Sequence, residues 1–482
     1  MSDGKTESAA ESGSGQPSVL GRAGPLVLAR FFTAVLTVCI PLVLARRMAL
    51  AEYGTYKQLF LVAQTLYFVL SFGLPQSLYF FVPRASHPRT FFGQTMLAMT
   101  GAGLLTVALI VAGAGPLAGW FNNPELAGHR LPLALYVLGL IGSYPLEIGL
   151  TAQGRMRTAA LTYLASDFTR CAAMILPVLA GFGLAGMMWA IAAHALVRFA
   201  ATWWLLCRGE GPLITRAHVG EQLRYAAPFA AAVLLSCAQS YGHQFAVSAA
   251  VSPELFAIYA VGCFQLPLVD LLYSPVSEVL MVRLGEDERE GRADRGAAAF
   301  REAVAMLAFA FFPLAAFLFA AAPEFIAALF GERFLEAVPL FRVGVVGIVL
   351  AVLPVDGALR GRNQTRQIFL AYLVKGLCTV PLVIVGVRQF GMLGGIGSWA
   401  IAECIGTLAM MARLPKALSS GGVVPGWSAL LPWRELGKAT LAAAAAGLGV
   451  VLLRDLHGRA AIVVPEGFAQ RMLPLALAGL SF

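Results

Sequence analysis

Ten ionisable side chains of this sequence, each within a long apolar stretch, are candidates for chemistry. The basic ones are Arg30, Arg170, Arg198, Arg342 and Lys375, and the acidic ones are Asp167, Asp270, Glu278, Asp356 and Glu403. If these stretches cross a membrane, an ionised group inside one costs roughly 2.5–3.5 kcal/mol on insertion scales, so each needs a partner or a function. Arginine presents a fork of N–H donors that suits phosphate. The chemistry indicated is anion binding, or movement of charge, within the membrane.

Two pairs of opposite charges are expected at matching depths. Asp167 and Arg198 lie nine residues from the inner ends of neighbouring predicted helices, and Lys375 and Glu403 share a depth in the second half of the chain. The separations, 375 − 167 = 208 and 403 − 198 = 205, are nearly equal. We predict two ion pairs, each joining a helical hairpin. A structural role is favoured for them over ion coupling.

Three arginines remain as candidates for cargo binding. Arg170 has only Asp167 within reach, three residues earlier, and Arg30 and Arg342 have no opposite charge at matching depth. The functional interpretation makes these arginines the cations that hold a diphosphate. In the alternative, Arg30, near the start of its helix, extends to the lipid headgroups.

Polar residues with helical spacing support a water-filled cavity. Arg30, Thr33 and Thr37 share one helix face, as do Gln64, Tyr67 and Ser71. Two further stripes are Ser236, Ser240 and His243, and Asp270, Ser274 and Glu278. Any single stripe is equally typical of hydrogen bonds between helices. Four stripes on helices that are equivalent under the repeat described below favour a central cavity.

Three acidic residues could carry a coupling proton or cation: Asp270, Glu278 and Asp356. Glu278 and Asp356 lie near the inner ends of their predicted helices, so both could instead be solvated. We predict no metal site, because the seven cysteines form no CxxC motif and sit in or beside apolar segments. We also predict no catalytic residues and no cofactor.

The elements that must position these residues are transmembrane helices. The chain has 482 residues, 59% hydrophobic and 13% charged, with mean hydropathy +0.75, whereas soluble domains carry about 25% charged residues. Apolar runs of about 20 residues recur without the alternation of barrel strands. We predict an all-α membrane protein with about 14 spans. The spans are 25–45, 56–82, 91–118, 131–152, 158–180, 184–207, 221–249, 254–282, 300–330, 335–359, 367–387, 392–411, 436–453 and a short or truncated 469–482.

Loop charges predict the orientation. With the N-terminus inside, 21 Lys and Arg residues fall in inner loops and nine in outer loops, the bias expected of cytoplasmic loops. We therefore predict a cytoplasmic tail at 1–24. The dispersed basic residues argue against nucleic-acid binding.

The two halves of the chain repeat. "AEYGTYKQLFLVAQ" resembles "SPELFAIYAVGCFQ", and "QGRMRTAALTY" resembles "RGRNQTRQIFLAY", both with an offset near 205 residues. An even number of helices per repeat gives both halves the same orientation. We predict two pseudo-symmetric six-helix bundles, 25–213 and 214–416, followed by two C-terminal helices in 417–482.

The segments "EYGTYKQLF", "SFGLPQSLYFFVPR" and "QGRMR" resemble those of oligosaccharide (Wzx-type, O-antigen or polysaccharide) flippases in the multidrug/oligosaccharidyl-lipid/polysaccharide exporter superfamily. The resemblance covers roughly residues 20–415. It implies a V-shaped, multidrug-exporter-like pair of bundles in a bacterial cytoplasmic (inner) membrane. It also implies a polyprenyl-diphosphate-linked oligosaccharide as cargo, moved from the inner to the outer leaflet for polysaccharide biosynthesis, and association with polysaccharide polymerase machinery.

Two other functions remain open. One is a cation-coupled small-molecule antiporter of the same fold, which needs a smaller and less basic cavity. The other is a membrane-embedded glycan polymerase or glycosyltransferase. Such enzymes usually need a large extramembrane loop or a surface carboxylate cluster, and the sequence has no HExxH, GxSxG or phosphate loop. We therefore expect a transporter and not an enzyme.

A genetic experiment separates the flippase from the polymerase. Cells that lose this protein are expected to accumulate complete lipid-linked saccharide units on the inner leaflet, because the units are made but not moved. The measurement is the leaflet distribution of those units. Single, unpolymerised units on the outer leaflet would instead identify a polymerase.

Overall fold

The computed structural model describes residues 33, 36–208 and 210–460. Apart from one isolated bridge between Ser420 and Val423, the regular structure in these ranges is helical. The predicted span at 25–45 is described only in part, by a helix at 36–47, and 469–482 lies outside the described residues.

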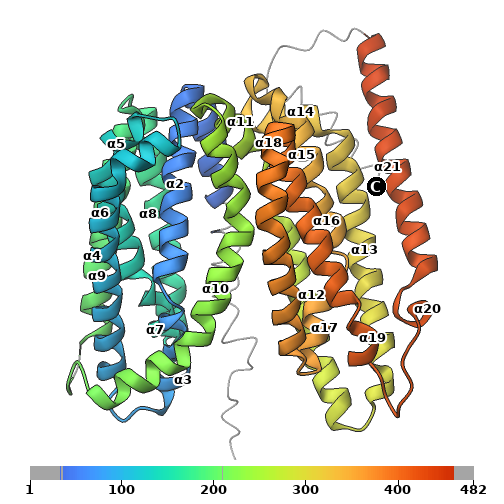
Figure 1. Cartoon of the computed structure of the whole chain (residues 1–482), viewed down its shortest axis with the longest axis horizontal. Helices are drawn as coiled ribbons and strands as arrows, with labels where there is room; N and C mark the ends of the chain where they lie inside the picture. The colour runs from blue at the N-terminus through green and yellow to red at the C-terminus, as the bar shows by residue number, and fades with distance from the viewer. Residues whose placement is uncertain (1–32, 34–35, 209, 461–482) are drawn as a thin grey trace, which may run out of the picture.

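The first half of the described chain contains α2 to α9 (Figure 1). Their bounds are α2 Leu50–Leu70, η1 Leu74–Ser77, α3 Leu78–Phe81, η2 Val82–Arg84, α4 Pro88–Trp120, α5 Glu125–Gly128, α6 Arg130–Ser143, α7 Pro145–Ala152, α8 Met156–Leu179 and α9 Gly183–Leu206. Helices α4, α6, α8 and α9 pack against their neighbours on the left in Figure 1.

The second half contains α10 to α21. Their bounds are α10 Arg216–Ala250, α11 Pro253–Gly262, α12 Pro267–Arg289, η3 Ala293–Arg295, α13 Gly296–Ala320, α14 Ala322–Phe330, η4 Glu332–Ala337, α15 Val338–Gly344, α16 Val346–Leu350, α17 Val355–Gly361, α18 Thr365–Met411, α19 Leu414–Ala417, α20 Trp427–Leu430 and α21 Trp433–Ala460. Helix α21 packs on α13 at the right-hand edge.

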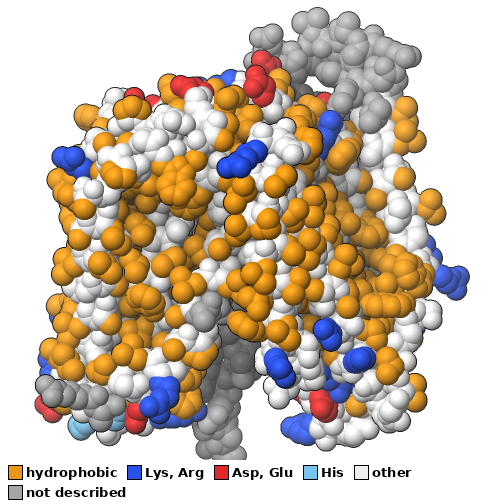
Figure 2. Space-filling view, viewed as in Figure 1, with side chains coloured by type: hydrophobic (Ala, Val, Ile, Leu, Met, Phe, Trp, Pro, Cys, Tyr) orange, Lys and Arg blue, Asp and Glu red, His pale blue; other side chains and the backbone are white. Residues whose placement is uncertain are grey.

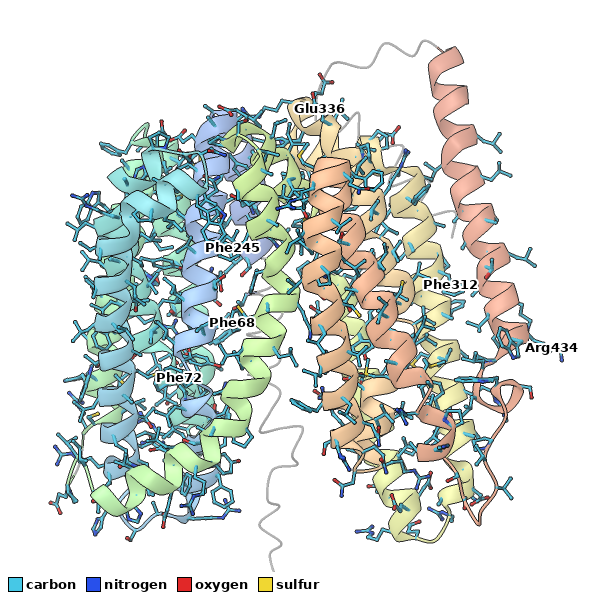
Figure 3. All side chains as sticks on the ribbon, viewed as in Figure 1. Phe68, Phe72, Phe245, Phe312, Glu336 and Arg434 are labelled. Atoms are coloured by element: carbon cyan, nitrogen blue, oxygen red, sulfur yellow. The ribbon has the colours of Figure 1, made fainter. Side chains whose placement is uncertain are left out.

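Helix α10 runs from the lower left to the top centre of Figure 1 and joins the two groups of helices. Near its start, Gln222 bonds to Gln94, Ser77 and Thr95 in the first half. Its later turns pack against α18, and the side chains of Phe68 and Phe245 lie between α2 and α10 (Figure 3). The domain boundaries at 213 and 416, and the symmetry of the two bundles, stay predictions.

Several predicted spans are broken rather than straight. Helices α2 and η1–η2 form one span bent by 43°, and α11 and α12 form one bent by 41°. Both breaks come at the prolines of η1 and α12, which lack an N–H and fix φ. Within α18 the backbone turns at Gly391, whose φ of 55° favours glycine, so α18 combines the predicted helices at 367–387 and 392–411.

Six described helices are long and apolar enough to cross a membrane, or eight when each bent pair is one span. The count of 14 stays a prediction. Large apolar side chains such as Phe309, Leu441 and Phe182 are at least 70% exposed. Figure 2 shows hydrophobic side chains over the middle of the molecule and charged ones mainly towards its two ends. This is the surface of a multi-pass membrane protein.

The two ends of the molecule differ in packing. At the top in Figure 1, α2 and α11 touch so closely that a Cβ on Gly54 would lie 1.8 Å from the carbonyl oxygen of Pro253. Below that contact Gln58 donates to Ser248 (3.0 Å) and accepts from Asn123 (2.6 Å), with all three side chains buried. At the bottom the surface is indented between the two groups of helices (Figure 2).

The Gly54 contact yields a prediction about stability. Gly54→Ala is expected to destabilise the fold by about 1–3 kcal/mol, because the added methyl group overlaps backbone that cannot rotate away. Thermal unfolding in detergent measures this change. The matched control is Gly101→Ala in α4, where a Cβ meets nothing within 4 Å and helix propensity favours alanine. Equal unfolding temperatures for the two variants would contradict the close α2–α11 contact.

Candidate functional site

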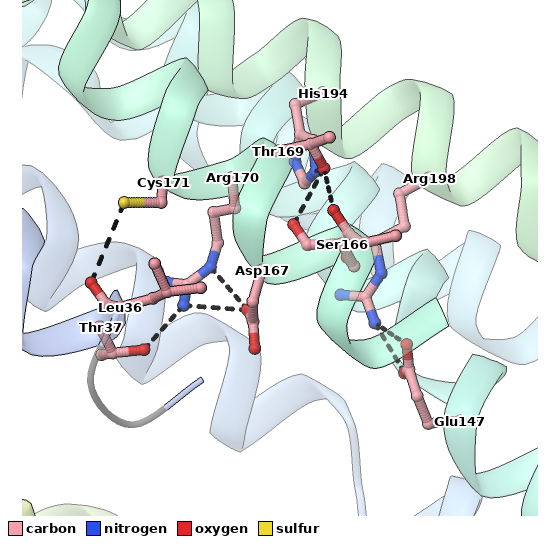
Figure 4. Close-up of polar contacts among 11 residues, drawn as sticks. Leu36, Thr37, Glu147, Ser166, Asp167, Thr169, Arg170, Cys171, His194 and Arg198 are labelled. Carbon is pink, nitrogen blue, oxygen red and sulfur yellow. Dashed lines mark hydrogen bonds and ion pairs between the residues drawn. The ribbon is translucent and has the colours of Figure 1, made fainter. Parts of the chain in front are cut away.

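The first group of helices contains a cluster of charged and polar side chains (Figure 4). Arg170 on α8 donates from Nε to Oδ1 of Asp167 at 3.0 Å, one helical turn earlier, and from Nη2 to Oγ1 of Thr37 at 3.1 Å. A quarter of the Arg170 side chain is exposed. Within the described part of the chain its Nη1 group makes no hydrogen bond or ion pair. Arg170 therefore has donors available for an anion.

The partner of Arg198 is Glu147 and not Asp167, which corrects the sequence prediction. Nη2 of Arg198 on α9 lies 2.7 and 2.6 Å from the two carboxylate oxygens of Glu147 on α7. Asp167 instead bonds to Arg170, because the i,i+3 spacing on one helix brings those two groups together. Sequence reasoning missed Glu147. Depth gives only an approximate signal, since Glu147 and Arg198 lie five and nine residues from the inner ends of the predicted spans 131–152 and 184–207.

Three tyrosine side chains lie within electrostatic range of this cluster. Arg170 is close enough to act electrostatically on Tyr56 and Tyr136, and the Arg198–Glu147 pair acts likewise on Tyr67. The Tyr67 ring packs edge-on against Tyr144, with centroids 5.0 Å apart. The structure thus brings Thr37, Arg170 and Tyr67, three predicted binding residues, into one polar region.

The other predicted residues of this region are less informative. Thr33 is buried and its hydroxyl has no partner within the described ranges, and Gln64 is partly buried on α2. Ser71 donates to the backbone oxygen of Tyr67 and completes the α2 stripe. Arg30 lies outside the described residues.

The second predicted ion pair forms. Lys375 and Glu403 bond across the two arms of α18, with Lys375 buried against Gly406. A small cavity of about 40 Å³ beside this pair is lined by Ala371, Tyr372, Lys375, Glu403, Gly406, Thr407 and Met410. That volume holds little more than a water molecule. The geometry therefore fits an ion pair with a structural role.

Polar stripes on two helices are exposed. Ser236 and Ser240 on α10 have exposed side chains, and so do Asp270, Ser274 and Glu278 on α12. Charged groups do not face lipid without severe cost, so exposed acids on a spanning helix indicate contact with water. His243, the third member of the α10 stripe, is instead buried and bonds to the hydroxyl of Tyr259 at 2.6 Å.

Asp356 is engaged by two neighbours. It accepts a hydrogen bond from the Tyr273 hydroxyl and pairs with Arg360 at 3.1 Å on its own helix. The other two predicted coupling acids, Asp270 and Glu278, make no ion pair within the described part of the chain. A mobile proton or cation is therefore better suited to Asp270 and Glu278 than to Asp356.

Arg342 lies away from the Arg170 cluster. Its Nε donates to the backbone oxygen of Phe319 at 3.0 Å, and its guanidinium lies 5.2 Å from the Phe319 ring. It lines an open groove of about 700 Å³ between α13, α15 and α21, together with Ala316, Phe319, Ala320, Thr440, Ala443, Ala444, Gly447 and Leu448. The structure therefore does not bring Arg342 together with Arg170, the other predicted binding arginine that it describes.

The sequence pattern of a family described as "polysaccharide biosynthesis protein" matches residues 43–339, more than half of the chain. The chain belongs to this family. The family predicted from the sequence is thereby confirmed. No curated protein matches the sequence.

Three solved structures of a flippase and two multidrug transporters have a similar fold. The lipid II flippase MurJ, in an inward closed conformation, superposes with a TM-score of 0.74 at 14% identity, over 94% of this chain and 96% of that chain. An inward-facing multidrug transporter of the MOP superfamily superposes with a TM-score of 0.67 at 13% identity, over 83% of this chain and 100% of that chain. An outward-facing multidrug transporter of the same superfamily superposes with a TM-score of 0.55 at 16% identity, over 84% of this chain and 97% of that chain. At these identities the comparison establishes the fold.

The corrected ion pair can be tested by paired substitutions. Glu147→Ala is expected to destabilise this family member by about 3 kcal/mol, because it leaves the partly buried Arg198 unpaired. Asp167→Ala should reduce the stability less, because Arg170 is partly exposed and keeps its hydrogen bond to Thr37. Thermal unfolding of the two variants ranks them, and Glu147→Leu with Arg198→Met should recover stability. If Asp167→Ala caused the larger loss of stability, the predicted Asp167–Arg198 pair would be favoured over the Glu147–Arg198 pair.

Proposed function

We propose that the protein moves a polyprenyl-diphosphate-linked oligosaccharide from the inner to the outer leaflet of a bacterial cytoplasmic membrane by alternating access. The observation that carries the proposal is the partly exposed Arg170, whose Nη1 group bonds to none of the residues that the structure describes, in a fold shared with a lipid II flippase. The family membership supplies the polysaccharide context.

The chemistry of the cluster suits a diphosphate. A diphosphate needs several donors, and arginine can give two parallel N–H bonds to phosphate oxygens. Thr37 already contacts Arg170, and the sequence places Arg30 and Thr33 on the same helix face as Thr37. We therefore assign the headgroup site to that face together with Arg170, with Gln64 and Tyr67 on the neighbouring α2 facing the sugar.

The arrangement of the two ends supports alternating access. The molecule is tightly packed where α2 meets α11 and indented at the opposite end. In the orientation that the loop charges favour, with a cytoplasmic N-terminus, the indented end faces the cytoplasm. Loading from that side is consistent with transport from the inner to the outer leaflet and with a downstream polymerase partner.

Leaflet-resolved flipping in proteoliposomes tests this function. Arg170→Ala is expected to lower the initial flipping rate about tenfold or more, because one charge-assisted phosphate contact is lost. Arg170→Lys should retain part of the rate, since it keeps the charge but not the fork. The matched control is Arg157→Ala, at the exposed start of the same helix.

Two results would count against the proposal. A folded Arg170→Ala variant with the unaltered rate would remove Arg170 from the site. Absence of flipping by the unmodified protein, together with proton- or sodium-driven uptake of a small cation, would favour the antiporter instead. Arg342→Ala, measured alongside, tests separately whether the predicted substrate role of Arg342 holds in its groove beside α21.

A further inference from the structure

Two arginines cross between the halves of the chain at the tightly packed end of the molecule. Arg46, at the end of the 36–47 helix, donates to the backbone oxygens of Ala328 and Leu329, the latter at 3.1 Å. Arg333, in η4, donates in the reverse direction to the backbone oxygens of Ala45 and Met48, the latter at 2.7 Å. We refer to these four contacts as the arginine clasp.

The acceptors of the clasp are the carbonyl groups of helix ends. Ala45 lies in the last turn of the 36–47 helix, and Ala328 and Leu329 lie in the last turn of α14. Carbonyls in the last turn of a helix have no partner within the helix, and a nearby cation is stabilised by the helix dipole. Each arginine therefore caps a helix that belongs to the other half of the chain.

The residues around the clasp are closely packed. Ala45, Met48 and Ala328 are at most 2% exposed, although the Arg46 side chain itself reaches the surface. Below them the rings of Tyr53 and Phe334 meet at 5.6 Å, and Arg333 lies 5.3 Å from the Phe334 ring. Any separation of the two helix ends would leave these carbonyls without their donors and expose the aromatic contact.

The clasp lies at the end of the molecule opposite the indentation. Helix α14 is at the top in Figure 1, and Glu336 of η4 is labelled at that end in Figure 3. A transporter that works by alternating access must open the end that is closed in this conformation. The clasp bridges that end through bonds from the two arginine side chains to backbone carbonyl groups of the other half.

We propose that Arg46 and Arg333 are conformational gate residues that hold this end closed, and that releasing them sets the population of the state open at this end. The inference rests on the proposed transport function for its purpose, but the gate itself can be measured without transport. Each arginine acts on the other half's backbone, so loss of either one should shift the population in the same direction.

The test uses a cysteine reporter beneath the closed end. Ser248→Cys is nearly isosteric, and Ser248 is fully buried and bonded to Gln58. It is introduced into a chain whose seven native cysteines are replaced by alanine. The protein is placed in nanodiscs, where both faces meet the solvent, and the rate of modification by a membrane-impermeant maleimide is measured.

Arg46→Ala and Arg333→Ala are each expected to raise the modification rate about tenfold, the change that follows from a tenfold shift in the open population. Arg46→Lys should raise it less, because lysine keeps the charge but lacks the fork. The control is Arg47→Ala, which removes an exposed charge from the adjacent position of the same helix. Size-exclusion profiles and unfolding temperatures show which variants fold. If Arg46→Ala does not fold, the modification rate of Arg46→Lys is compared with that of the unmodified arginine instead.

Two outcomes separate this inference from the proposed function. If folded Arg46→Ala and Arg333→Ala leave the rate unchanged, or if Arg47→Ala raises it equally, the clasp is not a gate. If the clasp variants raise the rate as expected but the unmodified protein flips no lipid-linked saccharide, the gate stands and the assignment of the cargo is overturned.

Discussion

An ionised side chain within a membrane must be neutralised by a partner, bonded to backbone or reached by water, and this constraint accounts for most of the polar structure described above. Arg198 and Lys375 are neutralised by Glu147 and Glu403. Arg342 is bonded to the backbone of Phe319. Arg170 differs from these, because its pairing with Asp167 leaves part of the guanidinium exposed and its Nη1 group without a bond among residues 33, 36–208 and 210–460. Exposure combined with incomplete bonding distinguishes a charged side chain that can bind a ligand from one in a structural ion pair.

The sequence predicts the helices and the depths of the charges well, because both depend on position along one chain. Apolar runs predict helices such as α4, α8 and α9, and depth correctly pairs Lys375 with Glu403. Partner choice between Asp167 and Glu147 depends on which helix faces end up adjacent, and periodicity within a single helix does not contain that information. The same limit applies to Arg342, whose depth suits a cavity but whose helix packs beside α13 and α21.

Breaks in the helices were only partly foreseeable. Prolines in the spans at 56–82 and 254–282 predict bending, and both spans bend by about the same angle, 43° and 41°. Pro145 removes one backbone donor between α6 and α7 without a comparable bend, because Tyr144 keeps helical dihedral angles and residues 130–152 still form one long apolar helix. Glu147, which pairs with Arg198, lies two residues after this proline.

The acid beside Arg170 also bears on how a carrier can release its cargo. Without Asp167, an unpaired arginine at this position would bind an anionic headgroup strongly and would be costly to maintain in the membrane. Asp167, bonded at 3.0 Å, offsets part of that charge and would repel the diphosphate of the proposed cargo. Transport requires a site that attracts its cargo enough to admit it and weakly enough to let it leave. A half-compensated arginine meets both requirements better than a fully free cation or a fully paired one, which is why the Arg170–Asp167–Thr37 arrangement is better suited to transport than to permanent binding.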